Sequence, residues 1–313
     1  MSKKGTVAKV ALGAAAVVAV AGNMACDLAI KRPDPLKEKK PETREVYIKR
    51  AQTRERNNRN FYNCEPEDLS LKAINGDNMR AWFLPAEKES KRFVICVHGY
   101  KCNGPDEFSH MAPFYHNDLG YNYLLPDLTA HGRSEGDYIG FGAPDAKNIL
   151  LWVDYLINRF GNDIEIILHG ISMGAATVMN CNEMSPPDQV KIIIEDCGFT
   201  SLWDLYTVQI GAATKIPAKV ILNLINPAFK VKLGFDIREA SPLNQVKKSK
   251  TPTLFVHGDK DTVVPFSMNY PIYAAAGCEK ERLVVEGATH CAAGYLFPEI
   301  YWGKITEFLN KYL

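Results

Sequence analysis

The sequence predicts an α/β fold in which a mostly parallel, doubly wound sheet carries an antiparallel N-terminal hairpin and a helical cap inserted between late strands. Three patterns carry this prediction: short continuous apolar runs of strand length, helical stretches between most of these runs, and one long interval with helix-like pieces of its own. Runs that are apolar on both faces belong to a sheet that is covered on both sides. Their alternation with helices implies right-handed crossovers between parallel strands.

The first predicted element of the sheet is the hairpin. Two alternating runs flank Asn75 and Gly76, and this dipeptide between such runs is typical of a tight antiparallel turn. The continuous apolar runs that follow predict strands at residues 92–99, 121–127, 164–170, 191–198, 253–258 and 282–287. The helical stretches predict helices at residues 144–160, 173–184 and 298–313.

The interval at residues 199–250 is too long for a simple crossover, and it contains two or three helix-like pieces. We therefore expect a cap over the sheet. Apolar side chains in a cap either wall a substrate pocket or pack against the core. The sequence leaves both possibilities open for Trp203, Leu205, Tyr206, Ile216, Leu222 and Phe229.

The chain before the hairpin divides into two predicted parts. In residues 1–30, three lysines precede an apolar, alanine-rich run at residues 10–22, which is the pattern of a signal peptide or a membrane anchor. A soluble N-terminal helix is the alternative, but we expect a membrane-anchored or exported protein rather than a cytoplasmic one. Residues 31–61 are dense in charge and predict a linker with some helix, and residues 62–313 form the globular domain.

The composition excludes several classes of protein. Of the 313 residues, 46% are hydrophobic and 23% are charged, as in an ordinary globular protein and unlike a disordered one. The formal net charge of +1 gives no reason to expect a nucleic-acid partner. The eight cysteines show no zinc-type spacing and are too scattered for a disulfide framework, so Cys96 and Cys197, inside apolar runs, are expected to be buried thiols.

A serine between glycines follows the predicted strand 164–170 and directly precedes a helix. In this strand–turn–helix context, the sequence G-x-S-x-G around Ser172 becomes a nucleophile elbow. The serine needs a strained backbone to raise its hydroxyl above the sheet, and the residues two before and two after it then crowd together. Gly170 and Gly174 have no side chains that could clash there. Ser172 is therefore the candidate nucleophile.

A serine needs a base, and the base needs an orienting carboxylate. Of the seven histidines, His290 lies on a loop after the last predicted strand, where a base can reach over the sheet. Asp261 follows the strand 253–258 and is the preferred carboxylate. Asp259 is expected to be a turn residue. Asp196 is the reserve candidate, although an internal hydrogen bond explains it better.

A tetrahedral oxyanion needs backbone donors. Tyr100 follows the early strand 92–99, and Met173 follows Ser172, so the N–H groups of Tyr100 and Met173 are the candidate oxyanion hole. Gly99 lets the backbone approach the substrate closely. We expect His98 to be structural.

These motifs together resemble the α/β-hydrolase superfamily, and most closely bacterial serine esterases with an N-terminal membrane segment and a helical cap. The resemblance implies Ser172 as nucleophile, Asp261 as orienting acid, His290 as base, and oxyanion donors at Tyr100 and Met173, in the chain order expected of this fold. It also implies that the turn at residues 127–136 is structural. The motifs that carry it are "HGY", "DLTAHGRSEG", "HGISMGAA", "HGDKDTVVP" and "GATH".

The sequence therefore predicts an enzyme that cleaves small-molecule carboxylic esters through an acyl-serine intermediate. A serine peptidase or an acyltransferase would use the same triad, and a binding scaffold without catalysis is a remote alternative. No cofactor and no metal are expected, because the chain has neither a phosphate-binding loop nor two histidines at H-x-x-x-H spacing. The sequence does not indicate the substrate-binding residues or the oligomeric state.

Overall fold

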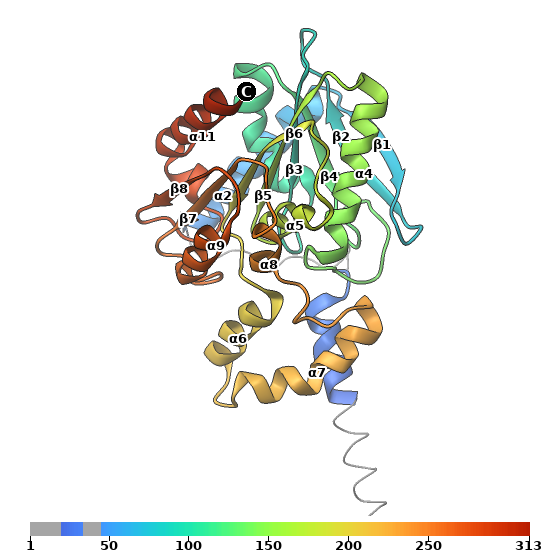
Figure 1. The fold of residues 1–313 in the computed structure, drawn as a ribbon, viewed down its shortest axis with the longest axis vertical. Coiled ribbons are helices and arrows are strands. Elements are labelled where there is room, and N and C mark those ends of the chain that lie inside the picture. Colours follow the sequence, from blue (N-terminus) through green and yellow to red (C-terminus); the bar gives the residue numbers. More distant parts are fainter. Residues whose placement is uncertain (1–19, 34–44) are drawn as a thin grey trace, which may run out of the picture.

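The structure, a computed structural model, describes residues 20–33 and 45–313. These residues form an eight-stranded mixed sheet with the strand order β1-β2-β4-β3-β5-β6-β7-β8 (Figure 1). The hairpin strands β1 and β2 are antiparallel, β2 is antiparallel to β4, and all other neighbours are parallel. The predicted fold class is confirmed. The strands are β1 (Glu67–Lys72), β2 (Asn78–Leu84), β3 (Arg92–Val97), β4 (Asn122–Asp127), β5 (Glu165–Ile171), β6 (Val190–Asp196), β7 (Thr253–Gly258) and β8 (Lys280–Val285).

Helices cover both faces of the sheet, as the two-sided apolar runs require. One face packs against α4, whose Trp152 and Val153 are fully buried, and against α5. The other face packs against α11, whose Tyr301 and Phe308 are fully buried. The helices around the sheet are α3 (Gly104–Phe108), α4 (Ala143–Phe160), α5 (Met173–Asn180), α8 (Pro242–Val246), α9 (Asn269–Ala275), α10 (Ala293–Leu296) and α11 (Pro298–Tyr312), with short 3-10 or π turns at η1 (Ser109–Met111), η2 (Pro113–Asp118), η3 (Cys181–Met184) and η4 (Phe266–Met268).

The charged segment before the hairpin contains the long helix α2 (Glu45–Asn63). This helix lies on the domain: Phe61 is 2% exposed and meets the ring of Tyr123 edge to face. The amide of Asn58 donates a 2.7 Å hydrogen bond to Asp106. The second half of the predicted linker thus packs at its C-terminal end against α3 and β4.

Residues 20–30 form a further helix, here called helix 20–30, which contacts the cap and the loop after β3. Its Asp27 pairs with Lys232 of the cap. At its C-terminal end, the Tyr100 hydroxyl donates to the carbonyl of Ala29 at 2.5 Å and the Lys101 ammonium donates to the carbonyl of Leu28 at 3.3 Å. These bonds satisfy carbonyls near the end of the helix, which accept no hydrogen bond from the helix itself.

Most of the predicted signal peptide or membrane anchor lies outside the described residues, so that assignment stays a prediction. Within residues 20–33 and 45–313, no helix has the length and hydropathy that crossing a bilayer requires.

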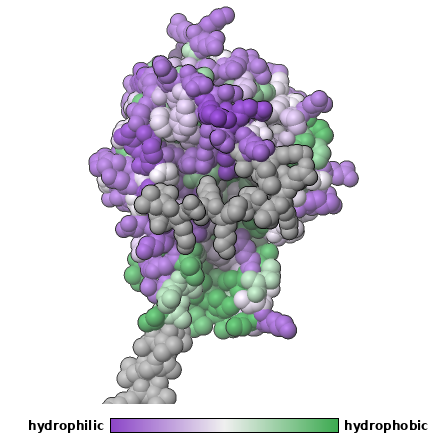
Figure 2. Space-filling model, turned by 180° about the vertical axis from the view of Figure 1, so that it is seen from behind, coloured by the Kyte–Doolittle hydropathy of each residue, from purple (hydrophilic) through white to green (hydrophobic). Residues whose placement is uncertain are grey.

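The cap consists of α6 (Leu202–Ala213) and α7 (Ala218–Leu233), which project together with helix 20–30 from one end of the sheet (Figure 1). Its outer surface is markedly more hydrophobic than the surface of the body (Figure 2). Two of the six apolar cap residues singled out in the sequence, Leu205 and Tyr206, line a cavity. The other four do not line it: Leu222 and Phe229 are buried in the core, Trp203 packs against the core and Ile216 is 55% exposed.

Candidate active site

Ser172 lies on the bend between β5 and α5, with φ 56° and ψ −115°. This left-handed backbone is strained for a residue with a side chain, and it points the hydroxyl away from the sheet. The two flanking glycines make the bend possible. A Cβ on Gly170 would lie 2.2 Å from the carbonyl oxygen of Gly174, and a Cβ on Gly174 would lie 1.8 Å from the carbonyl oxygen of Val97.

His290 lies on the loop after β8, and its side chain contacts Ser172. Its Nε2 lies 2.9 Å from Oγ of Ser172, and its Nδ1 lies 2.7 Å from Oδ2 of Asp261. Three side chains that are far apart in the sequence thus form one continuous hydrogen-bonded chain. The structure brings together all three residues of the predicted triad.

The Asp261 carboxylate is held in place by the turn that follows β7. Its Oδ1 accepts hydrogen bonds from the N–H groups of Val263 and Val264, both at 2.9 Å, which leaves Oδ2 for His290. The side chain is fully buried, and Nε2 of His257 lies 3.4 Å from Oδ2. Burial raises the pKa of Asp261, but the hydrogen bonds from His257 and His290 outweigh it and hold this pKa well below its usual range.

The opposite shift holds for the imidazole. Burial lowers the pKa of His290, whereas the neighbouring Cys291 and the Asp261 carboxylate raise it, and the net direction is upward. His290 therefore carries a proton more readily than an ordinary histidine. This suits a base that must hold a proton between two steps of a reaction.

The two other carboxylates near these loops have structural partners. Asp259 accepts a 2.7 Å hydrogen bond from the N–H of Gly287 and pairs with Lys260, as expected of a turn residue. Asp196 accepts a 3.0 Å hydrogen bond from the Tyr301 hydroxyl, and burial raises its pKa to about 6. Asp196 therefore has the internal hydrogen bond that the sequence favoured over a catalytic role.

The predicted oxyanion donors flank Ser172 in space. Tyr100 and Met173 both line the cavity above the serine. Met173 is the first residue of α5, where backbone N–H groups have no acceptor within the helix. A Cβ on Gly99 would lie 3.5 Å from Cβ of Ser172, so the backbone at Gly99 is in contact range of the serine. His98 is fully buried, and its Nε2 accepts a hydrogen bond from the N–H of Leu128, as expected of a structural histidine.

A cavity of about 510 Å³ opens above the serine and the imidazole. The cap supplies part of its wall through Leu205, Tyr206 and Gln209. Helix 20–30 supplies another part, which the sequence pattern of residues 1–30 does not indicate because it predicts a signal peptide or anchor. The lining residues from this helix are Ala25, Leu28 and Ala29.

The comparisons with known proteins bear on the fold. The structure superposes on the esterase Pf2001 of Pyrococcus furiosus with a TM-score of 0.65, covering 80% of this chain and 93% of that one at 22% sequence identity. The chain has the α/β-hydrolase fold.

Similarity in sequence extends over the α/β-hydrolase domain. A family model described as BD-FAE matches residues 143–274, somewhat under half of the chain. The uncharacterized protein YqkD of Bacillus subtilis is 25% identical over 251 residues, which is 80% of this chain and 81% of that protein. The lysophosphatidylserine lipase ABHD12 of Danio rerio is 26% identical over 210 residues, which is 64% of this chain and 51% of that protein.

Two thiols, those of Cys197 and Cys291, lie beside the imidazole of His290. The sequence does not indicate that they are neighbours. Sγ of Cys197 lies 3.7 Å from Sγ of Cys291. The hydrogen bond with Cys197 lowers the pKa of Cys291, and burial raises it. The charge of His290 also lowers this pKa, and the net result is a pKa of about 7. Among the described residues, Cys197, Cys291 and His290 form the one group close enough to hold a metal ion. A metal there would occupy the imidazole that also contacts Ser172 and Asp261.

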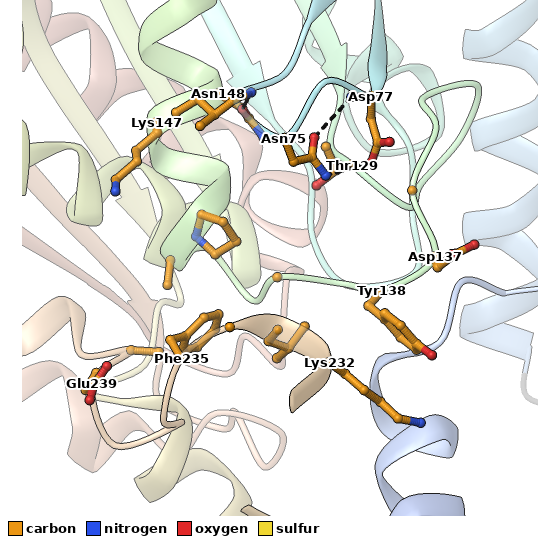
Figure 3. Close-up of a pocket in the computed structure, with 18 of the residues that line it drawn as sticks. Asn75, Asp77, Thr129, Asp137, Tyr138, Lys147, Asn148, Lys232, Phe235 and Glu239 are labelled. Carbon is orange, nitrogen blue, oxygen red and sulfur yellow. Dashed lines mark hydrogen bonds between the residues drawn. The ribbon is translucent and has the colours of Figure 1, made fainter. Parts of the chain in front are cut away.

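A second cavity, of about 850 Å³, lies between the end of α7 and the turn after β1 (Figure 3). Its lining is polar, with Asn75, Asp77 and Asn148 from the body and Glu239 from the cap side. Ser172, Asp261 and His290 are absent from this lining. The larger cavity is therefore separate from the candidate active site.

Proposed function

We propose that this protein is a serine hydrolase that cleaves carboxylic esters through an acyl-serine intermediate. The observation that carries the proposal is the hydrogen-bonded chain from Ser172 through His290 to Asp261, with distances of 2.9 Å and 2.7 Å, at the floor of a cavity. A serine hydroxyl is a weak nucleophile unless a base accepts its proton. The triad supplies that base together with the carboxylate that orients it.

In the first half of the proposed reaction, Oγ of Ser172 attacks the ester carbonyl and its proton passes to Nε2 of His290. The tetrahedral intermediate collapses as His290 donates this proton to the leaving alcohol. In the second half, His290 takes a proton from water, the resulting hydroxide attacks the acyl-serine, and the proton returns to Oγ as the acid leaves. Asp261 stabilises the imidazolium that forms in each half.

The N–H groups of Tyr100 and Met173 would stabilise the oxyanion in both tetrahedral intermediates. The positive end of α5 points at the same place, because Ser172 immediately precedes this helix. Loss of a single oxyanion donor commonly costs about 3 kcal/mol in the barrier.

The names of similar proteins support the reaction class. Pf2001 is an esterase, and ABHD12 is a lysophosphatidylserine lipase. The cavity supports an acyl group as the bound part of the substrate, since its volume of about 510 Å³ is within the range of ligand pockets. Its apolar lining includes Leu28, Phe141, Met173, Phe199, Leu205 and Tyr206.

The test is hydrolysis of p-nitrophenyl esters, from acetate to decanoate, by the full chain. We expect turnover with an optimum beyond acetate, because a two-carbon acyl group would leave most of the cavity unfilled. A fluorophosphonate probe is expected to label Ser172, as peptide mapping by mass spectrometry would show. Absence of both turnover and labelling in folded protein would overturn the proposal. Labelling without ester turnover would indicate a peptidase or a transferase instead.

The pH dependence of kcat/KM follows from the pKa of His290. Only the neutral imidazole can accept the proton of Ser172, so activity falls as the pH drops through this pKa. Since the pKa is raised in the folded protein, the acidic limb is expected to have its midpoint above about 6.5, the ordinary value for histidine. A midpoint below that value would contradict the assignment of His290 as a base paired with Asp261.

The contribution of His290 to the free energy of unfolding is expected to change with pH in the direction opposite to that of activity. A histidine with a raised pKa stabilises the fold in its protonated form, so this contribution is present at low pH and is lost as the pH rises through the folded pKa. The protonated imidazole of His290, beside Cys291 and Asp261, thus favours folding at the low pH values that suppress turnover. Thermal unfolding followed across the same pH range separates the two effects.

A further inference from the structure

Helix α7 has two apolar faces. Its buried face carries Leu222, Ile225 and Phe229, which pack in the core. On the roughly opposite side, Val220, Leu224 and Val231 recur at helical spacing and are 50%, 49% and 86% exposed. A surface helix in water ordinarily has a polar outer face. The outer face of α7 therefore requires an explanation other than the packing of the cap.

Helix 20–30 repeats this arrangement. Gly22, Cys26 and Ile30 face the domain and are buried, whereas Val20, Met24 and Leu28 are 61%, 63% and 80% exposed. A Cβ on Gly22 would lie 3.2 Å from the carbonyl oxygen of Leu224, so this helix crosses α7 closely. Both helices lie at the cap end of the molecule (Figure 1).

Together these side chains form a surface that we call the outer cap surface. It lies at the cap end of the molecule, which is more hydrophobic than the polar body above it in Figure 2. A contiguous exposed apolar area on one side of a protein marks an interaction site. The outer cap surface consists of Val20, Met24, Leu28, Val208, Ile216, Val220, Leu224 and Val231.

The exposed charged side chains between α6 and the end of α7 are all positive, whereas Asp27 of helix 20–30 pairs with Lys232. Between Asp204 and Asp236 the chain has no acidic residue, and its charged side chains there are Lys215, Lys219, Lys230 and Lys232. Lys215, Lys219 and Lys230 are exposed. Lysines beside an apolar surface match a phospholipid bilayer whose anionic headgroups attract them.

We propose that the outer cap surface binds the face of an anionic phospholipid bilayer. The sequence continues from Val20 toward the N-terminus as an apolar run with lysines at positions 3, 4 and 9, which repeats the chemistry of the surface itself. Leu28 belongs to the outer cap surface and also lines the cavity above Ser172. Bilayer contact thus places the cavity entrance beside the lipid.

A consequence for the substrate rests on the proposed function. If Ser172 cleaves esters, those that reach it from this side are amphiphiles held in the bilayer, with the acyl chain entering past Leu28. The cavity beside the serine is lined by side chains that suit such a chain.

The test compares two double variants of the full chain in co-sedimentation with phosphatidylcholine vesicles, with and without phosphatidylglycerol. Ile216→Glu/Val231→Glu places two negative charges on the outer cap surface, at residues that do not line the cavity. Ile74→Glu/Ile300→Glu is the matched control, since both isoleucines are similarly exposed on the body, at 62% and 55%. Thermal unfolding verifies that both variants fold.

We expect the cap variant to lower the vesicle partition coefficient at least about tenfold, because each carboxylate must leave water and meets anionic headgroups. The control is expected to match the wild type, and phosphatidylglycerol to strengthen wild-type binding. A partition coefficient of the cap variant within twofold of wild type overturns the proposal. The proposal is also overturned if the cap variant converts a dimer into a monomer and leaves vesicle binding unchanged. That result would make the surface an interface between two copies. Binding is measured without turnover, so this result is independent of the ester assay.

Discussion

Replacing Ser172 with alanine is expected to lower kcat for p-nitrophenyl esters by at least about 10⁴-fold. The substitution removes the atom that forms the acyl intermediate, and no other described hydroxyl hydrogen-bonds to His290. What remains is binding in the cavity and the oxyanion donors, which alone give only a small part of the acceleration of such enzymes. Labelling by a fluorophosphonate is expected to disappear as well.

The fold of this variant is expected to be unchanged. Alanine occupies the same strained backbone as serine, so the strain at φ 56° is neither relieved nor increased. Ser185→Ala is the matched control, since Ser185 also has a positive φ, of 52°, but is exposed and lies outside the cavity. Steady-state kinetics and thermal unfolding of both variants are the measurements. If Ser172→Ala kept more than a tenth of wild-type activity, the serine mechanism would be excluded.

Asp261→Asn is expected to lower kcat by about 10⁴-fold while the fold is kept. The asparagine oxygen can still accept the hydrogen bonds from Val263 and Val264. Its NH₂ group would then face Nδ1 of His290, which must become an acceptor. The imidazole proton moves to Nε2, and Nε2 can no longer accept the proton of Ser172.

Asp259→Asn provides the comparison for this variant. Asp259 lies two residues away and interacts with Gly287 and Lys260 rather than with His290, so its loss is expected to change kcat less than about threefold. The pH profile gives a second readout. Removal of the Asp261 charge lowers the pKa of His290, so the residual activity of Asp261→Asn should have its acidic limb at lower pH than wild type. An equal loss in the two variants would identify general damage to the loop rather than an orienting carboxylate.

The sheet and the triad geometry could be anticipated from the sequence for the same physical reason. A strand of a parallel sheet is covered on both sides, so it appears as a continuous apolar run, and the six predicted strands end within two residues of β3 to β8. The carboxyl ends of such strands meet at one edge. Ser172 directly follows β5, and Asp261 and His290 lie on the loops that follow β7 and β8. This placement predicts their proximity without any knowledge of side-chain contacts.

The parts that could not be predicted depend on which face of a helix meets a partner. Helix 20–30 and α7 are apolar on both sides, so periodicity alone does not distinguish the buried face from the exposed one. The same ambiguity concealed that Leu205 and Tyr206 line the cavity while Leu222 is buried. The approach of Cys197 to Cys291 brings together residues 94 positions apart and has no local signal.

The cavity wall built from helix 20–30 has a thermodynamic consequence. The helix is held beside the site by the pair of Asp27 with Lys232 and by hydrogen bonds from Tyr100 and Lys101 to two of its carbonyls. Seating of the helix and occupation of the cavity are therefore linked equilibria. If the seated helix raises the affinity of the cavity for an acyl group by some factor, then a bound acyl group raises the equilibrium constant for seating the helix by the same factor.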